Sequence, residues 1–166
     1  KLININQKYN IDNPFIFYPA QFWPHKNHIY ILKGIYILEK KYNILLNVIF
    51  SGGDKGNKKN IIQFANKLGI RNRVTFTGFI TNHELFSIYK MSLALVMPTF
   101  YGPTNIPPLE AFKIGTPVIY SDLDGLRDQV EDAGLLVDLY DPQTLANCLS
   151  KLIKKKNFRN NIIEKG

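Results

Sequence analysis

The residues best suited to bind an anion lie where a polar loop runs into a predicted helix. Residues 98–106 are rich in Gly, Pro, Thr and Asn, and Pro107 and Pro108 mark the helix start, since proline is favoured in a first helical turn. First-turn N–H groups lack partners within the helix, and the helix dipole is positive there, so both features suit a phosphate. Four residues keep a usable N–H at this point: Asn105, Ile106, Leu109 and Glu110.

Glu110 adds a carboxylate to this helix start. A carboxylate repels a phosphate, but it accepts hydrogen bonds well from neutral hydroxyl groups. An acidic residue binds the ribose hydroxyls in this way in dinucleotide-binding folds. Glu110 therefore has two interpretations: a ribose ligand, or a first-turn glutamate that only complements the helix dipole.

Lys26 ends a second informative loop, residues 19–26, and directly precedes a predicted helix. A lysine at this position can pair with a pyrophosphate as a point charge. Gln21 in the same loop offers an amide donor, although a loop-packing role explains an amide equally well. His25 and His28 could share a helix face, but the sequence suggests no third ligand, so we predict no metal site.

Small residues follow two further predicted strands. Gly52 and Gly53 come just after the apolar run at residues 45–50, and Gly78, followed by Phe79 and Ile80, comes after the next such run. Glycine lets the backbone approach a ligand closely. These turns therefore read either as edges of a binding site or as ordinary connections between a strand and a helix.

The stretch at residues 98–122, PTFYGPTNIPPLEAFKIGTPVIYSD, resembles the signature loop of the retaining glycosyltransferases of family 4, the group 1 glycosyl transferases with the GT-B fold. That family pattern contains two glutamates. Glu110 matches the second, which in the family holds the ribose of a nucleotide sugar. Gly102 stands where the first glutamate is expected. Residues 103–105, Pro-Thr-Asn, replace the family's Gly-Phe-Gly turn, and the resemblance then assigns the contact with the donor sugar to Thr104 and Asn105.

The resemblance also assigns roles to residues in the other loops. Lys26 matches a lysine that holds the diphosphate, and Gln21 stands where the family has an arginine for the same purpose. Glutamine keeps a donor but lacks the charge and the bidentate geometry of arginine. Ile80, directly after Phe79, matches the residue that reads the base through its backbone. The resemblance implies no essential metal ion and no other cofactor.

Apolar runs and helical patterns alternate along the chain. Strands are predicted at residues 15–18, 45–50, 74–76, 93–97, 118–120 and 135–137. Helices are predicted at residues 27–42, 58–68, 82–91, 107–114, 125–131 and 141–155. This order is typical of a doubly wound, Rossmann-like α/β fold, in which helices cover both faces of a parallel six-stranded sheet. We therefore predict that residues 1–166 form a single domain, and the resemblance implies that this domain is one half of a GT-B fold.

The strand order decides which loops meet. In the common order 3-2-1-4-5-6, the first and fourth strands are neighbours where the order reverses, and ligands bind there at the carboxyl ends of the strands. The loops at residues 19–26 and 98–107 would then face one crevice. Lys26 and the helix start at Pro107 are thereby expected at the same site.

Composition limits the possible classes of function. The chain has 166 residues, a net charge of +8, 45% hydrophobic residues and a single cysteine, Cys148. No apolar run approaches the ~20 residues of a membrane span, and a lone cysteine excludes an internal disulfide. The sequence contains neither a dinucleotide-binding glycine pattern nor a P-loop, and no basic patch is interleaved with aromatic residues. We therefore expect neither a dehydrogenase nor an NTPase, and no nucleic acid as a partner.

The resemblance to the group 1 family implies that the chain is the C-terminal, donor-binding half of a longer glycosyltransferase. The expected ligand is a nucleotide-diphosphate sugar, transferred with retention to a saccharide or lipid-linked acceptor held by a separate N-terminal domain. The expected location is the cytoplasm, including the inner face of the cell membrane. The alternative is a non-catalytic nucleotide-binding domain, or a module that docks on polyanions or membranes, because Gly102 and Gln21 replace charged family residues.

Overall fold

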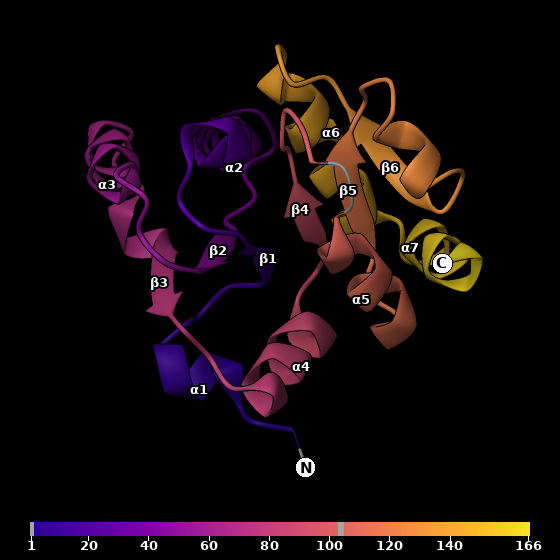
Figure 1. Cartoon of the computed structure of the whole chain (residues 1–166), viewed down its shortest axis with the longest axis horizontal. Coiled ribbons are helices and arrows are strands. Elements are labelled where there is room, and N and C mark those ends of the chain that lie inside the picture. Colours follow the sequence, from indigo (N-terminus) through magenta and orange to yellow (C-terminus); the bar gives the residue numbers. More distant parts are fainter. Residues whose placement is uncertain (1, 103–104) are drawn as a thin grey trace.

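Six parallel strands form one sheet at the centre of the molecule (Figure 1). The computed structural model describes residues 2–102 and 105–166. In chain order the strands are β1 (Phe15–Pro19), β2 (Asn47–Ser51), β3 (Val74–Gly78), β4 (Leu95–Met97), β5 (Val118–Ser121) and β6 (Gly134–Val137). Across the sheet their order is β3-β2-β1-β4-β5-β6. The predicted doubly wound, six-stranded fold is confirmed, and so is the position of β4 beside β1.

Helices cover both faces of the sheet (Figure 1). One face carries α2 (His28–Tyr42), α3 (Lys58–Lys67) and α6 (Pro142–Lys154), and the other carries α1 (Ile5–Tyr9), α4 (Asn82–Met91) and α5 (Ile106–Ile114). The last helix, α7 (Lys156–Lys165), follows α6. Because both faces are covered, the residues of β1, β2, β4 and β5 are almost all buried.

The helices bury the residues that their spacing predicts. In α2, Ile31, Ile35 and Leu38 are fully buried on the side that faces the core. α2 also packs closely against α6, and Gly34 permits this approach. A Cβ added at Gly34 would lie only 2.5 Å from Cδ2 of Leu145. The smallest residue therefore stands where the two helices come closest.

One predicted helix is wrong, and two α-helices of the described structure, α1 and α7, lie outside the predicted ranges. Residues 125–131 form turns around a short 3-10 helix, Arg127–Gln129, instead of an α-helix. Gly125 and Glu131 have left-handed φ angles of 79° and 44°, and such angles interrupt a regular helix. The five residues of α1 are too few to display a helical period in the sequence.

All strand neighbours are parallel, so the carboxyl ends of the strands share one edge of the sheet. The loops that follow β1 and β4 are adjacent at this edge because those two strands are paired. No helix in the described part of the chain is both long enough and apolar enough to span a bilayer.

Candidate functional site

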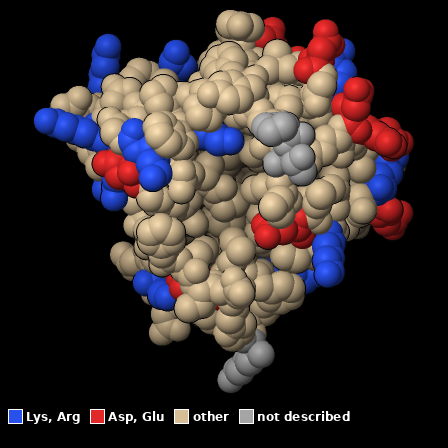
Figure 2. Space-filling view, in the orientation of Figure 1, with Lys and Arg blue, Asp and Glu red and all other residues tan. Residues whose placement is uncertain are grey.

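The loops after β1 and β4 meet as the strand order predicts. The N–H of Phe100 donates a hydrogen bond to the His25 carbonyl at 3.0 Å, and the rings of His25 and Tyr101 stack with their centroids 4.3 Å apart. Between the loops lies a cavity of about 380 Å³, which we call the β1–β4 crevice. Figure 2 shows the surface hollowed near the centre of this view, with mostly uncharged residues around the hollow. The crevice is lined by Pro19, Ala20, Gln21, Trp23, His25, Lys26, Met97, Asn105, Ile106 and Pro107.

Lys26 reaches the crevice from the end of the first loop. The Lys26 carbonyl accepts a hydrogen bond from the Tyr18 hydroxyl at 3.0 Å, which anchors the backbone at this point. The side chain is half-buried, and this burial lowers the pKa of its ammonium group. No carboxylate of the described residues forms an ion pair with Lys26. A half-buried cation without a counter-ion favours an anionic ligand, because a partner of opposite charge offsets its desolvation.

The start of α5 faces the same crevice. α5 begins at Ile106, and the N-cap residue Asn105 has an extended backbone. Regular bonding in an α-helix then pairs the N–H groups of Leu109 and Glu110 with carbonyls inside the helix. The two prolines between them and Ile106 have no N–H. Within the described residues, the first turn therefore offers two donors without a partner, the N–H groups of Asn105 and Ile106, rather than the four expected from the sequence.

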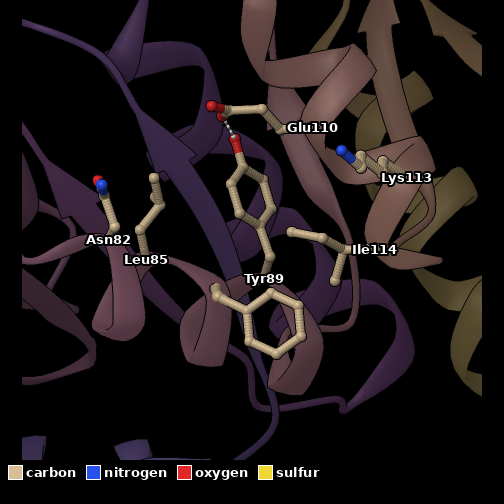
Figure 3. A pocket seen from close by; sticks show the side chains of 7 residues that line it. Asn82, Leu85, Tyr89, Glu110, Lys113 and Ile114 are labelled. Atoms are coloured by element: carbon tan, nitrogen blue, oxygen red, sulfur yellow. Dashed lines mark hydrogen bonds between the residues drawn. The ribbon is translucent and has the colours of Figure 1, made fainter.

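Glu110 lies in a second cavity of about 460 Å³, the α4–α5 hollow (Figure 3). Its Oε2 atom accepts a hydrogen bond from the Tyr89 hydroxyl at 2.9 Å. Burial, together with the nearby carboxylate, raises the pKa of Tyr89, so the phenol remains a donor. The hollow is lined by Asn82, Leu85, Phe86, Tyr89, Glu110, Lys113 and Ile114.

The β1–β4 crevice and the α4–α5 hollow lie along the same helix. Pro107 lines the crevice, and Glu110 lines the hollow. Residues three apart lie on the same side of an α-helix. A ligand that follows the first turn of α5 could therefore touch both. The structure thus brings Lys26 and the α5 start into one cavity and places Glu110 next to it.

The other residues predicted to bind the donor do not all line the crevice. Gln21 lines the crevice, and its Oε1 atom accepts a hydrogen bond from the indole N–H two residues later at 3.1 Å. Phe79, after β3, is 90% exposed, Leu109 is exposed on α5, and Ile80 packs partly against the core. Thr104 lies outside the described residues.

Gly52 and Gly53 lie against the backbone of the loop that follows β1. A Cβ added at Gly52, where φ is 145°, would lie 2.5 Å from the Ala20 carbonyl oxygen. The carbonyl of Gly53 accepts a hydrogen bond from the Phe22 N–H at 3.0 Å. The close approach that glycine permits here is therefore to the backbone of the β1 loop.

The structure also adds residues to which the sequence assigns no ligand role. Trp23, His25 and Met97 line the crevice, and Tyr89 holds Glu110. Trp23 and His25 belong to a loop that the strand order already singles out. Tyr89 and Glu110 are joined by a tertiary contact between two helices, and no local sequence pattern indicates it.

The fold is a doubly wound α/β fold, and it has a crevice where the strand order reverses, the place at which such folds bind ligands. The sequence profile of the glycosyl transferases group 1 matches residues 3–166, so the chain belongs to that family. An uncharacterized glycosyltransferase of Methanocaldococcus jannaschii is 28% identical over 92% of this chain and 39% of its own length. The chain thus spans about two fifths of that relative.

Solved structures share this fold. A structure of Anabaena Alr3699/HepE in complex with UDP and glucose superposes with a TM-score of 0.86 at 20% identity, over 97% of this chain and 44% of that one. The C-terminal domain of the group 1 glycosyl transferase LpcC from Francisella tularensis has a TM-score of 0.78 at 21% identity, over 98% and 88% of the two chains. The chain therefore has the fold of that LpcC domain over almost its whole length.

Proposed function

We propose that the chain binds a uridine-diphosphate sugar and is the donor-binding domain of a retaining glycosyltransferase. One observation carries the proposal: in a chain of the group 1 family, Lys26 and the start of α5 converge on one crevice. Both are groups that favour negative charge. The Anabaena structure, whose ligands are UDP and glucose, supports UDP as the nucleotide.

In this proposal the diphosphate lies between Lys26 and the N–H groups of Asn105 and Ile106. Lys26 supplies a charge-assisted hydrogen bond, and the two N–H groups present the positive end of the helix dipole. Gln21 contributes a neutral donor through its Nε2 group. Negative charge on the diphosphate increases as the bond to the sugar breaks, so these groups stabilise the transition state more than the ground state.

Glu110 accepts hydrogen bonds from the ribose hydroxyls through the oxygen that Tyr89 leaves free. The base then extends toward the carboxyl end of β3, where Phe79 and Ile80 lie. Thr104 and Asn105 are proposed to meet the donor sugar, and Leu109 to cover the ligand from the exposed side of α5. Gly52 and Gly53 support the diphosphate indirectly, because they fix the β1 loop from behind.

We further propose that the acceptor is a saccharide or a lipid-linked saccharide, bound by another domain of a longer cytoplasmic protein at the inner membrane face. The relative from Methanocaldococcus jannaschii is long enough for such a domain, since the chain covers 39% of it. The second candidate is a non-catalytic nucleotide- or polyanion-binding domain. Gly102 and Gln21 favour it, because neither brings charge to the site. Polyanion docking driven by a net charge of +8 weakens steeply as salt rises, whereas binding in a pocket weakens less.

The test is a calorimetric or NMR titration with UDP and with uridine. Lys26→Ala is expected to weaken UDP binding by about 1–3 kcal/mol, the scale of a charge-assisted hydrogen bond, and to leave uridine binding unchanged. Lys33→Ala on α2 is the matched control, since Lys33 packs over Phe64 instead of lining the crevice. Equal UDP affinity in Lys26→Ala removes Lys26 from the site. If no UDP-, GDP- or dTDP-sugar binds the wild-type chain, the second candidate is favoured.

A further inference from the structure

A closed set of hydrogen bonds lies directly behind the start of α5. Asn105 Nδ2 donates to the Tyr120 hydroxyl, and the Tyr120 hydroxyl donates to Gln129 Oε1 at 3.0 Å. Gln129 Nε2 in turn donates to the Asn105 backbone carbonyl. We call these three residues the polar ring. It ties the N-cap of α5 to the end of β5 and to the short 3-10 helix at Arg127–Gln129.

The polar ring is largely shielded from water and carries no charge. Asn105 is 5% exposed and Tyr120 is fully buried. Breaking one of these bonds leaves a buried polar group unpaired, which is costlier than losing the same bond at the surface. Because every member is neutral, the ring fixes this corner of the crevice without placing a negative charge beside it.

Asn105 depends on the ring for its orientation. An N-cap asparagine normally accepts hydrogen bonds from the N–H of the second or third helical residue. Those residues in α5 are Pro107 and Pro108, which have no N–H, and Asn105 makes no side-chain capping bond. Its side-chain amide is therefore held by Tyr120 and its backbone carbonyl by Gln129, from other parts of the fold, instead of by its own helix.

Gly102 leaves the space that the ring requires. The Gly102 carbonyl accepts a hydrogen bond from Asn105 Nδ2 at 3.4 Å. A Cβ added at Gly102 would lie 2.5 Å from Asn105 Oδ1. A side chain at position 102 would force the Asn105 side chain to shift, so the glycine leaves room for the position that Asn105 takes in the ring.

We propose that Tyr120 and Gln129 are positioning residues, which hold the N–H groups of Asn105 and Ile106 in the arrangement that binds a diphosphate. The inference rests on the proposed function, because the diphosphate is the ligand of those N–H groups. Asn105 and Ile106 line the crevice, whereas Tyr120 and Gln129 lie behind it. A donor pair that is already ordered loses less conformational freedom when the ligand arrives, and affinity rises accordingly.

The experiment compares Tyr120→Phe and Gln129→Met with the wild-type chain by titration with UDP and with uridine. Both variants keep the side-chain size and remove ring hydrogen bonds. We expect each to weaken UDP binding about tenfold and to change uridine binding by less than about twofold. Tyr30→Phe is the matched control. Tyr30 is also buried, and its hydroxyl contacts Thr144 Oγ1 at 3.1 Å between α2 and α6, on the other side of the sheet from α5.

The outcomes distinguish a failure of the positioning role from a failure of the proposed function. A selective loss for UDP in the ring variants, absent in Tyr30→Phe, supports the positioning role. Unchanged UDP affinity overturns it, and so does an equal loss for UDP and uridine, which indicates general loosening of the fold. A wild-type chain that binds no UDP refutes the proposed function and the inference together. Wild-type binding with unaffected ring variants refutes the inference alone.

Discussion

Single residues in this protein take their roles from what surrounds them. Lys26 is half-buried and has no carboxylate partner in the described part of the chain, so it remains available to an anion. Glu110, one helical turn from the crevice, is already engaged through one oxygen by Tyr89. Its second oxygen is the group that a ligand can use. The two side chains thus suit opposite parts of a nucleotide, its phosphates and its hydroxyls.

The role proposed for Glu110 predicts a selective loss of affinity. Glu110→Gln is expected to weaken binding of UDP by about 1–3 kcal/mol and to affect a 2′,3′-dideoxy analogue little, because only the ribose diol donates to the carboxylate. Tyr89→Phe should show the same selectivity with a smaller loss, since it frees the Glu110 side chain without removing it. Titration of both ligands measures this, with the exposed Glu164→Gln on α7 as the control. An equal loss for both ligands would assign Glu110 a structural role.

His28 predicts how stability depends on pH. It is fully buried among aromatic rings, and neither ring nitrogen makes a regular hydrogen bond within the described structure. The pKa of His28 falls to about 3, because the lowering effect of burial exceeds the raising effect of the nearby Ala20 carbonyl. The unfolded chain takes up a proton near the ordinary histidine pKa of about 6.5, whereas the folded chain does not. Stability therefore falls as pH drops from about 6.5 toward about 3.

The measurement is urea unfolding of the wild-type chain and His28→Phe at a series of pH values. Relative to the variant, the wild type should lose about 3 kcal/mol of unfolding free energy between about pH 7 and about pH 4. Carboxylates titrate in both proteins over this range, so their contribution cancels in the difference. Parallel curves for the two proteins would show that His28 does not control the acid response.

At the scale of elements, the packing of α2 on α6 limits what the chain tolerates. These helices lie side by side on one face of the sheet, and α2 begins directly after the loop that carries Lys26 (Figure 1). Leu145 of α6 is fully buried against α2. A shift between these helices would move the start of α2 and the loop before it. The geometry of the crevice therefore depends on a helix contact outside it.

Substitutions at Gly34 and Leu145 should be coupled. Gly34→Ala is expected to destabilise the chain by about 1–3 kcal/mol through overpacking, and Leu145→Ala by about 2–5 kcal/mol through cavity formation. In the double variant the new methyl group occupies part of the cavity, so the total cost should be smaller than the sum. Urea unfolding gives the free energies. Gly53→Ala is the control, because the nearest atom to its added Cβ is 3.8 Å away. Strict additivity would contradict the coupling.

At the scale of the whole molecule, the chain carries a six-stranded sheet covered on both faces (Figure 1) and, on the proposed function, one side of a reaction site. The 166 residues should therefore unfold cooperatively as one unit. The crevice and the hollow are both partly open to solvent, and Figure 2 shows the surface hollowed near the centre of the view. A ligand there keeps part of its contact with water. Tight binding and catalysis then require a second surface to close over the ligand.

We accordingly predict weak binding and no transfer by the 166-residue chain alone. A UDP-sugar should bind with a Kd on the order of 0.1–1 mM, because the pocket is open to solvent. Transfer also requires an acceptor held in line with the donor, a positioning effect worth several kcal/mol. Titration and a transfer assay on this chain and on a longer protein that contains it test both statements. Sugar transfer by the 166-residue chain would refute the need for a second domain.

The amino-acid sequence by itself determined the number and type of the strands, most helices and the meeting of two loops. These features depend on local periodicity and on the common strand order, so the crevice with Lys26, Gln21 and Asn105 could be predicted. The α-helix predicted at residues 125–131 was wrong, because backbone angles at single residues interrupt a regular helix there and local periodicity does not reveal such angles.

Tertiary structure alone decided which side chains are engaged with each other. Tyr89 bonds to Glu110, and Asn105 bonds to Tyr120 and Gln129, from elements that are separate in the chain. The bounds of α5 also reduced the expected donors to two. Such pairings depend on how distant elements pack, and side chains far apart in the sequence carry no local pattern that reveals them. Hydrogen-bond partners at the site therefore had to come from the folded chain.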